Sequence, residues 1–491
     1  MGALLKNGLV AGLALFAGAC ASVPQPPPAT SLDTVEATLA RDIATLSSVE
    51  FAGRFPGGVG EDKTRAFLIE RFREIGLQPG LGTDAQGQPD WTQDFTLVRR
   101  APADASATLT LGQRSVALSD GLLAAHPGLD TALLADVPLV GIDPETETLA
   151  PDSLVNRALV LPASELVRRG PQFAGAAPKA VVLTSDDAES YERFRGFFAT
   201  GRWRLESDEG GTALFLLSPE DSTGLTDLIG RNAARHPDGL GIIAYDTMLD
   251  ATIRQDVERI ETANVIGRLP GTLDDAGAVL VLAHWDHLGD ACGPPDAADR
   301  LCNGAVDNAS GLAVMVEAVR LAAMDGPLER DIIVLATSAE ELGLLGAEAF
   351  VADPPVPLPT IVAGFNIDTI AIAPRDTPVV VLGAGETQLD FGISEVARVQ
   401  GREVVPSDFQ DQFLRRQDGW VFLREGVPTV LAGSALADPA AFQAFLQGPY
   451  HGAGDEVGEG LELGGAAQDT LLHAALLRYF AALWTYPGGG G

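Results

Sequence analysis

Histidine and carboxylate side chains recur in five short segments of the sequence, in combinations that suit metal binding and proton transfer. The segments are His284-Trp285-Asp286-His287, residues 304–311 around Asp307, Glu340-Glu341, Asn366-Ile367-Asp368 and Tyr450-His451-Gly452. Each segment alone has an ordinary explanation as a core residue, a helix cap or a solvated turn. Together they offer two imidazoles and three carboxylates, the mixed nitrogen and oxygen set that zinc accepts, and they leave one carboxylate for proton transfer.

Roles within these segments follow from residue type and spacing. His284 could bind a metal while Asp286, two residues later, orients its ring. Asp307 precedes a helical run, so it could bridge two cations or simply cap that helix. The adjacent Glu340 and Glu341 could divide the work between a base and a ligand.

Strands are expected immediately before most of these residues. Apolar runs typical of strands cover residues 278–284, 332–336 and 361–367. Ligands of open α/β sheets bind at the carboxyl edge of the strands, so we expect the polar residues to meet there.

The chain changes character along its length. Residues 34–46 and 61–75 have helical periodicity, and residues 104–243 consist of short apolar runs between polar turns. Strand-like and helical stretches then alternate up to a last expected helix at 471–484. This predicts an α/β fold with a mixed, mostly parallel sheet, helices on both faces, and a small β-rich inserted domain. The expected division is residues 32–103 and 256–491 for the catalytic domain and 104–255 for the insertion.

The charge balance limits the partners. The 491 residues include 67 Asp and Glu against 33 Lys and Arg, a formal net charge of -34. This excess opposes binding to a phosphate backbone, so we expect no nucleic acid partner. Solubility, a salty habitat and cationic substrates are all compatible with such acidity.

The first twenty residues resemble an export signal. Lys6 supplies a positive charge, and residues 8–19 form an apolar stretch too short to span a membrane. Small residues before Cys20 fit both signal cleavage and lipid attachment to that cysteine, and the Pro-rich residues 21–31 would form a tether. We expect a periplasmic protein, an outer-membrane lipoprotein or a secreted one, without a transmembrane helix in its mature form.

Two further cysteines, Cys292 and Cys302, lie in one loop. In an oxidising compartment they should form a disulfide. The alternative is a metal site, but a lone pair of thiolates does not fill a tetrahedral shell.

In their order along the chain, the five segments resemble the co-catalytic zinc peptidase family, clan MH, that includes aminopeptidase S, aminopeptidase Y and glutamate carboxypeptidase. That family has a His-x-Asp, a bridging Asp, a Glu-Glu pair, an Asn-x-Asp and a final His in the same order. Residues 50–54 and 264–267 resemble its N-terminal helices and the entry to its catalytic core. The insertion occupies the place of its protease-associated domain.

The resemblance implies two zinc ions, although the sequence alone does not distinguish zinc from cobalt or manganese. The implied ligands are His284 and Asp368 for one ion, Glu341 and His451 for the other, and Asp307 between them. Asp286 would support His284, and Glu340 would be the general base that moves a proton from the attacking water to the leaving amine. Tyr450 would either stabilise the oxyanion or pack.

The substrate is expected to be a peptide, and an aminopeptidase is favoured because acidic groups suit a free amine. Carboxypeptidase or dipeptidase activity is the alternative, with Arg415 and Arg416 available for a substrate carboxylate. A glutaminyl cyclase would use a single zinc ion. A receptor-like binding scaffold would have lost ligands, whereas this chain keeps them all. The sequence leaves the oligomeric state open.

Overall fold

The computed structural model describes residues 30–488 except 119–120, 174, 209, 231–232, 236–239, 408–409 and 459. The expected export signal, Cys20 and nearly all of the expected tether lie outside the described residues. Within the described part of the chain, no helix has both the length and the apolar character needed to cross a bilayer.

The central sheet consists of the strands that the apolar runs predict. They are β12 (Ala278–His284), β13 (Asp331–Thr337), β14 (Ile361–Asn366), β15 (Val379–Leu382), β16 (Val404–Val405) and β17 (Thr429–Gly433). β12 lies between β13 and β14, and β14 pairs with β17, all in parallel. β15 is antiparallel to β17 and parallel to β16, while the end of β11 (Ile242–Leu269) is antiparallel to β13. The mixed, mostly parallel sheet is therefore confirmed, and its parallel strands end at one edge.

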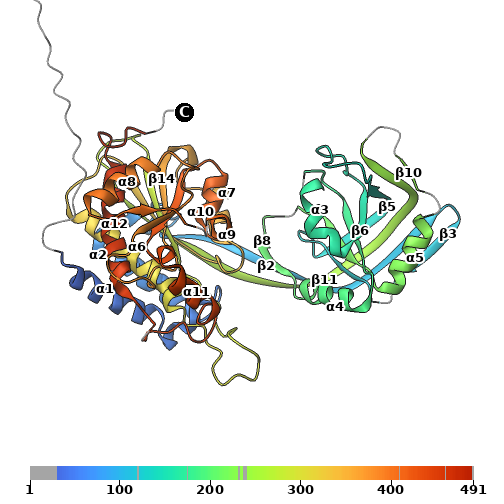
Figure 1. The fold of residues 1–491 in the computed structure, drawn as a ribbon, viewed down its shortest axis with the longest axis horizontal. Helices are drawn as coiled ribbons and strands as arrows, with labels where there is room; N and C mark the ends of the chain where they lie inside the picture. Colours follow the sequence, from blue (N-terminus) through green and yellow to red (C-terminus); the bar gives the residue numbers. More distant parts are fainter. Residues whose placement is uncertain are drawn as a thin grey trace, which may run out of the picture.

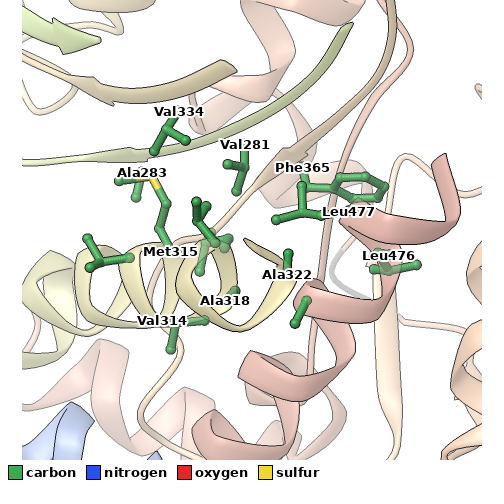
Figure 2. Packing of buried hydrophobic residues seen from close by; sticks show 14 of the residues in the cluster. Val281, Ala283, Val314, Met315, Ala318, Ala322, Val334, Phe365, Leu476 and Leu477 are labelled. Atoms are coloured by element: carbon green, nitrogen blue, oxygen red, sulfur yellow. The ribbon is translucent and has the colours of Figure 1, made fainter. Parts of the chain in front are cut away.

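Helices cover both faces of this sheet. One face carries α1 (Leu32–Leu46), α2 (Glu61–Ile75), α6 (Gly311–Met324), α8 (Asp390–Val399) and α12 (Leu463–Ala481), and the other carries α7 (Leu345–Ala352) and α10 (Gly419–Arg424). Alternate residues of β12 point to opposite sides: Val281 packs with the first set and Leu280 with the second. In Figure 2, Val281 and Ala283 of β12 face Met315 of α6.

The last helix differs from its expected limits. It was expected over residues 471–484 but runs from Leu463 to Ala481. Gly464 and Gly465 suggest a loop, yet they form the first turn of α12. This turn packs directly against the backbone of a neighbouring segment. A Cβ at Gly465 would be 2.5 Å from the carbonyl oxygen of Ala373, so only glycine allows this contact.

A long antiparallel ribbon leads to a second body. β2 (Thr92–Leu111) pairs with β11 along most of its length, and together they reach from the central sheet to the inserted unit (Figure 1). The remaining strands are β1 (Gln78–Pro79), β3 (Arg114–Leu118), β4 (Leu123–Ala125), β5 (Thr131–Ile142), β6 (Ala158–Pro162), β7 (Ala180–Thr184), β8 (Arg202–Leu205), β9 (Ala213–Leu216) and β10 (Ala234–Arg235).

The inserted unit has hydrophobic clusters of its own on both sides of a sheet in which β5, β6, β7 and β9 pair in parallel. It also contains α3 (Leu166–Phe173), α4 (Ala188–Ala199) and α5 (Pro219–Ile229), so it is a mixed α/β unit and not only a β-rich one. The expected boundaries at residues 104 and 255 fall inside β2 and β11, which continue into the catalytic domain. The likeness to a protease-associated domain stays a prediction.

The predicted disulfide between Cys292 and Cys302 is confirmed, with 5.4 Å between the two Cα atoms. Its loop packs on the turn before α2: a Cβ at Gly53 (φ +63°) would be 2.4 Å from the carbonyl oxygen of Cys302. The disulfide loop and this turn are therefore held in fixed contact.

Two methionines of α6 provide a test of this packing. Met315 is fully buried between helix and sheet, whereas Met324, nine residues further along, is 59% exposed. We expect Met315→Ala to lower the free energy of unfolding by about 2–5 kcal/mol, because the cavity would be lined by a packed sheet. Met324→Ala should change it by less than about 0.5 kcal/mol. Thermal unfolding followed by circular dichroism measures both, and equal melting temperatures would contradict the packing described.

Candidate metal centre

One strand end and four loops bring the candidate ligands to one edge of the sheet. His284 is the last residue of β12, Glu341 follows β13 and Asp368 follows β14. Asp307 lies just before α6, and His451 lies in the loop between α11 (Pro439–Gln447) and α12. The three parallel strands are neighbours, so residues far apart in sequence meet where these strands end.

Asp307 lies at the centre of the cluster. Its Oδ1 is 3.3 Å from Nε2 of His284, and its Oδ2 is 3.3 Å from Nε2 of His451. Asp368 Oδ1 lies 3.5 Å from Nε2 of His284, and Glu341 Oε2 lies 3.0 Å from Nε2 of His451. Two groups of ligand atoms therefore share one carboxylate, each group on its own side.

These separations fit divalent cations. Two ligand atoms about 2.0–2.1 Å from a tetrahedral zinc ion are about 3.3 Å apart, which matches the contacts around Asp307. The carboxylates of Asp307 and Glu341 are only 5% and 4% exposed. Buried carboxylates so close together repel one another unless positive charge lies between them. In both donor chemistry and spacing, the residues fit a pair of metal ions.

The pKa values of the two imidazoles also indicate that the carboxylates need positive charge near them. Burial alone would lower the pKa of His451, but its contacts with Asp307 and Glu341 raise the pKa to about 10. For His284, burial is again opposed by Asp286, Asp307 and Asp368, and the pKa lies well above its usual range. The carboxylates thus attract positive charge, which a metal ion supplies more strongly than a proton.

Glu340 differs from the ligands. Its carboxylate lines the cavity beside His284 and accepts no hydrogen bond from another described residue. Burial, together with the charges of Asp418 and Glu341, raises its pKa well above the usual range. A carboxylate with a raised pKa next to the ligand cluster can take up and release a proton.

Asp286 contacts both His284 and the Glu-Glu pair. Nδ1 of His284 is 3.2 Å from the backbone oxygen of Asp286 and 3.7 Å from its carboxylate. The carboxylate instead accepts hydrogen bonds from the backbone N–H groups of Glu340 and Glu341, at 3.0 and 3.3 Å. Asp286 therefore positions the Glu-Glu pair as well as the imidazole.

Asp455 makes a corresponding contact that sequence reasoning missed. Its buried carboxylate accepts hydrogen bonds from the backbone N–H groups of Val306 and Asp307, at 2.8 and 2.9 Å. Burial raises its pKa to about 6, although these two hydrogen bonds oppose the rise. Since His451 lies four residues earlier, one loop both supplies an imidazole and holds Asp307. The only signal in the sequence was this proximity to His451.

Arg54 and His287 were also missed as supporting residues. The fully buried guanidinium of Arg54 donates hydrogen bonds to the carbonyl oxygens of four residues in three segments, namely Leu46, Trp285, Asn303 and Gly304. It thus joins the loop after His284 to the loop before Asp307, and burial lowers its pKa to about 10. His287 donates toward Glu341 from within the core.

Three loops at the site contain left-handed backbone in residues other than glycine. The φ angles are +57° at Ala339, +55° at Thr369 and +54° at His451. Each conformation costs about 1–3 kcal/mol and persists only where the surroundings impose it. All three positions are candidate ligands or lie within two residues of one, and further left-handed residues such as Asp136, Asp152 and Ala177 occur in the inserted unit.

A cavity opens from the cluster and is largely apolar at its far end. Its apolar lining includes Ile370, Leu382, Leu431, Leu436, Phe442 and Leu446. Tyr450 also lines it, with its ring stacked on His451 at 3.8 Å between centroids. Asp418 lies buried behind the site, accepts a hydrogen bond from Thr337 and has a pKa raised to about 7 by burial.

An α/β sheet whose carboxyl edge gathers imidazoles and carboxylates around a shared aspartate defines a metallohydrolase. Residues 264–471 match peptidase family M28, and we identify them as an M28 peptidase domain, so the chain is a metallopeptidase. This range includes all five candidate ligands and Glu340. The predicted resemblance to the clan MH peptidases is confirmed.

Several solved structures are similar to the chain at low sequence identity. An aminopeptidase from Aneurinibacillus is 15% identical with a TM-score of 0.47, covering 91% of this chain and 94% of its own. A zinc aminopeptidase from Bacillus subtilis is 18% identical with a TM-score of 0.46, covering 91% and 96%. A peptidase M28 precursor from Shewanella amazonensis is 16% identical with a TM-score of 0.45, covering 92% and 95%. A comparison with curated proteins gives no significant match.

The role of Asp455 can be tested with one substitution. Asp455→Asn keeps the shape, but its amide nitrogen cannot accept a hydrogen bond, so one backbone N–H near Asp307 loses its partner. We expect metal affinity to fall by about 10–100-fold, the usual effect of losing a group that supports a ligand. Asp94→Asn, at a side chain that is 75% exposed, is the control. Unchanged affinity in Asp455→Asn, measured by competition with a chelator, would contradict this role.

Proposed function

We propose that the protein is a zinc-dependent exopeptidase that removes single residues from the amino terminus of peptides. The observation that carries the proposal is the position of Asp307, whose two oxygens face two imidazoles on opposite sides. A shared carboxylate of this kind suits two cations more naturally than one. The proposal therefore assigns His284 and Asp368 to one zinc ion, Glu341 and His451 to the other, and Asp307 to both.

When bound, zinc supplies Lewis acidity, which lowers the pKa of a water molecule and polarises the scissile carbonyl. Glu340 takes the proton of the attacking water, for which its raised pKa is suited, and returns it to the leaving amine. The hydroxyl of Tyr450 faces no described hydrogen-bond partner and lines the same cavity, so it is available to the oxyanion. Asp286 keeps Glu340 in place through the backbone.

The cavity supports cleavage next to a chain terminus. Much of its lining is apolar, with Leu382, Leu431 and Phe442 among the residues, so it suits an apolar side chain of the substrate. The carboxylates of Glu340 and Asp368 at its polar end suit a protonated α-amine, which favours the amino terminus.

Arg416 supports a second candidate, a carboxypeptidase or dipeptidase. It lines the cavity, is exposed, and forms no ion pair with a described carboxylate. A substrate carboxylate could therefore reach it. Arg415 instead lies over the ring of Trp420, with no place in the cavity lining. No such observation favours a glutaminyl cyclase or a scaffold without activity. Neither needs both a carboxylate shared by two metal ions, Asp307, and a free general base, Glu340.

We also propose that the protein is exported, as a periplasmic protein, a lipoprotein attached to the membrane through Cys20, or a secreted one. The disulfide between Cys292 and Cys302 supports an oxidising compartment. Peptides are the proposed partners, and the formal charge of -34 argues against nucleic acid.

The adjacent Glu340 and Glu341 give a matched pair of variants. Glu340→Gln should keep both metal ions and lower kcat by about 10²–10⁴-fold, because it removes only the base. Glu341→Gln should lose one metal ion, since it removes a ligand. Metal content by mass spectrometry and turnover of a leucyl anilide distinguish the two variants. Full activity in Glu340→Gln would reject it as the base.

The direction of cleavage can be tested with blocked peptides. Residues 21–491, loaded with zinc, should shorten a free peptide one residue at a time from its amino terminus. Acetylation of that terminus should stop the reaction, and amidation of the carboxyl terminus should not. The reverse pattern, followed by mass spectrometry, would assign the carboxypeptidase function instead.

A further inference from the structure

His287 is a buried imidazole that the proposed ligand set does not use. Its side chain is fully buried, and Nδ1 lies 2.6 Å from Oε1 of Glu341. Its other nitrogen, Nε2, is also buried and has no hydrogen-bond partner among the described residues. Buried polar groups are usually hydrogen-bonded, so a buried imidazole with only one hydrogen-bonded nitrogen points to a specific role for that bond.

The contact identifies the donor. An ionised carboxylate can only accept hydrogen bonds, so the proton lies on Nδ1 of His287 when Glu341 is ionised. His287 contacts one oxygen of the Glu341 carboxylate, and His451 lies near the other. Oε1 of Glu341 faces His287, whereas Oε2 lies 3.0 Å from Nε2 of His451. The two oxygens of this carboxylate therefore have different partners.

The same distance argues against Nδ1 of His287 as a ligand atom. Two atoms on one tetrahedral zinc ion lie about 3.3 Å apart, and the proposed ligand contacts between imidazole and carboxylate measure 3.0–3.5 Å. The 2.6 Å between His287 and Glu341 is shorter than all of these. It is a hydrogen-bond distance that leaves no room for a cation between the two atoms. His287, Asp307 and Glu341 do lie close enough for a metal to be considered there, so the alternative needs a test.

We infer that His287 is a positioning residue for Glu341: its Nδ1–H holds Oε1 so that Oε2 stays directed at the cation site shared with Asp307 and His451. The inference rests on the proposed function, because it takes Glu341 to be a ligand. The backbone N–H of Glu341 is already bonded to Asp286, so His287 fixes the remaining freedom, which is rotation of the side chain. Ligands held in this way bind metal more tightly.

Asparagine and glutamine distinguish the two ring nitrogens. The amide nitrogen of asparagine occupies the position of Nδ1, and that of glutamine the position of Nε2. We expect His287→Gln and His287→Ala to weaken binding of the zinc ion assigned to Glu341 and His451 by about 10–100-fold. His287→Asn should restore the affinity to near that of the wild type. The other zinc ion should bind normally in all three variants.

The measurement is zinc affinity by competition with a chromophoric chelator, with melting temperature in excess EDTA as the control for folding. Asparagine and glutamine variants with equal metal-free stability but different zinc affinity would support the inference, because a purely structural role would not separate them. Equal affinity in the two variants would overturn it. Loss of one zinc ion from His287→Ala as complete as that from His451→Ala would also overturn it, by making His287 a ligand. A wild type that binds no zinc would reject the proposed function as well.

Discussion

The site depends on keeping three carboxylates, those of Asp307, Glu341 and Asp368, within a few ångströms of one another in a buried place. Their mutual repulsion would separate them in a flexible chain. The chain opposes this with hydrogen-bond donors and one buried cation, the Arg54 guanidinium, in the structure around them. The groups around the carboxylates therefore act together with a bound cation in holding them close to one another.

The ligand loops are joined to one another by a small set of side chains. Asp286 joins the end of β12 to the Glu-Glu pair, and Asp455 joins the His451 loop to Asp307. The side chain of Asn308 donates to the carbonyl of Ile367 and accepts from the N–H of Thr369, which joins the Asp307 loop to the Asp368 loop. Asp286, Asp455 and Asn308 each make more than one hydrogen bond to a ligand loop. A shift of one ligand loop therefore affects the position of the next.

Sequence reasoning reached most of the site because ligands of a metal carry chemical identity and follow recognisable strands. His284 ends an apolar run that predicts a buried strand, and Glu340 and Glu341 follow another. Asp455, Arg54 and His287 were missed because their roles depend on which backbone groups or side chains the fold brings near them. The early start of α12 was missed for the same reason, since Gly464 and Gly465 read locally as a loop.

Whether two metal ions share Asp307 can be measured in crystals of the zinc-loaded protein at the zinc absorption edge. We expect two anomalous peaks, one on each side of Asp307, the first beside His284 and Asp368 and the second beside Glu341 and His451. A single peak, or a second peak beside His287 and away from His451, would contradict it.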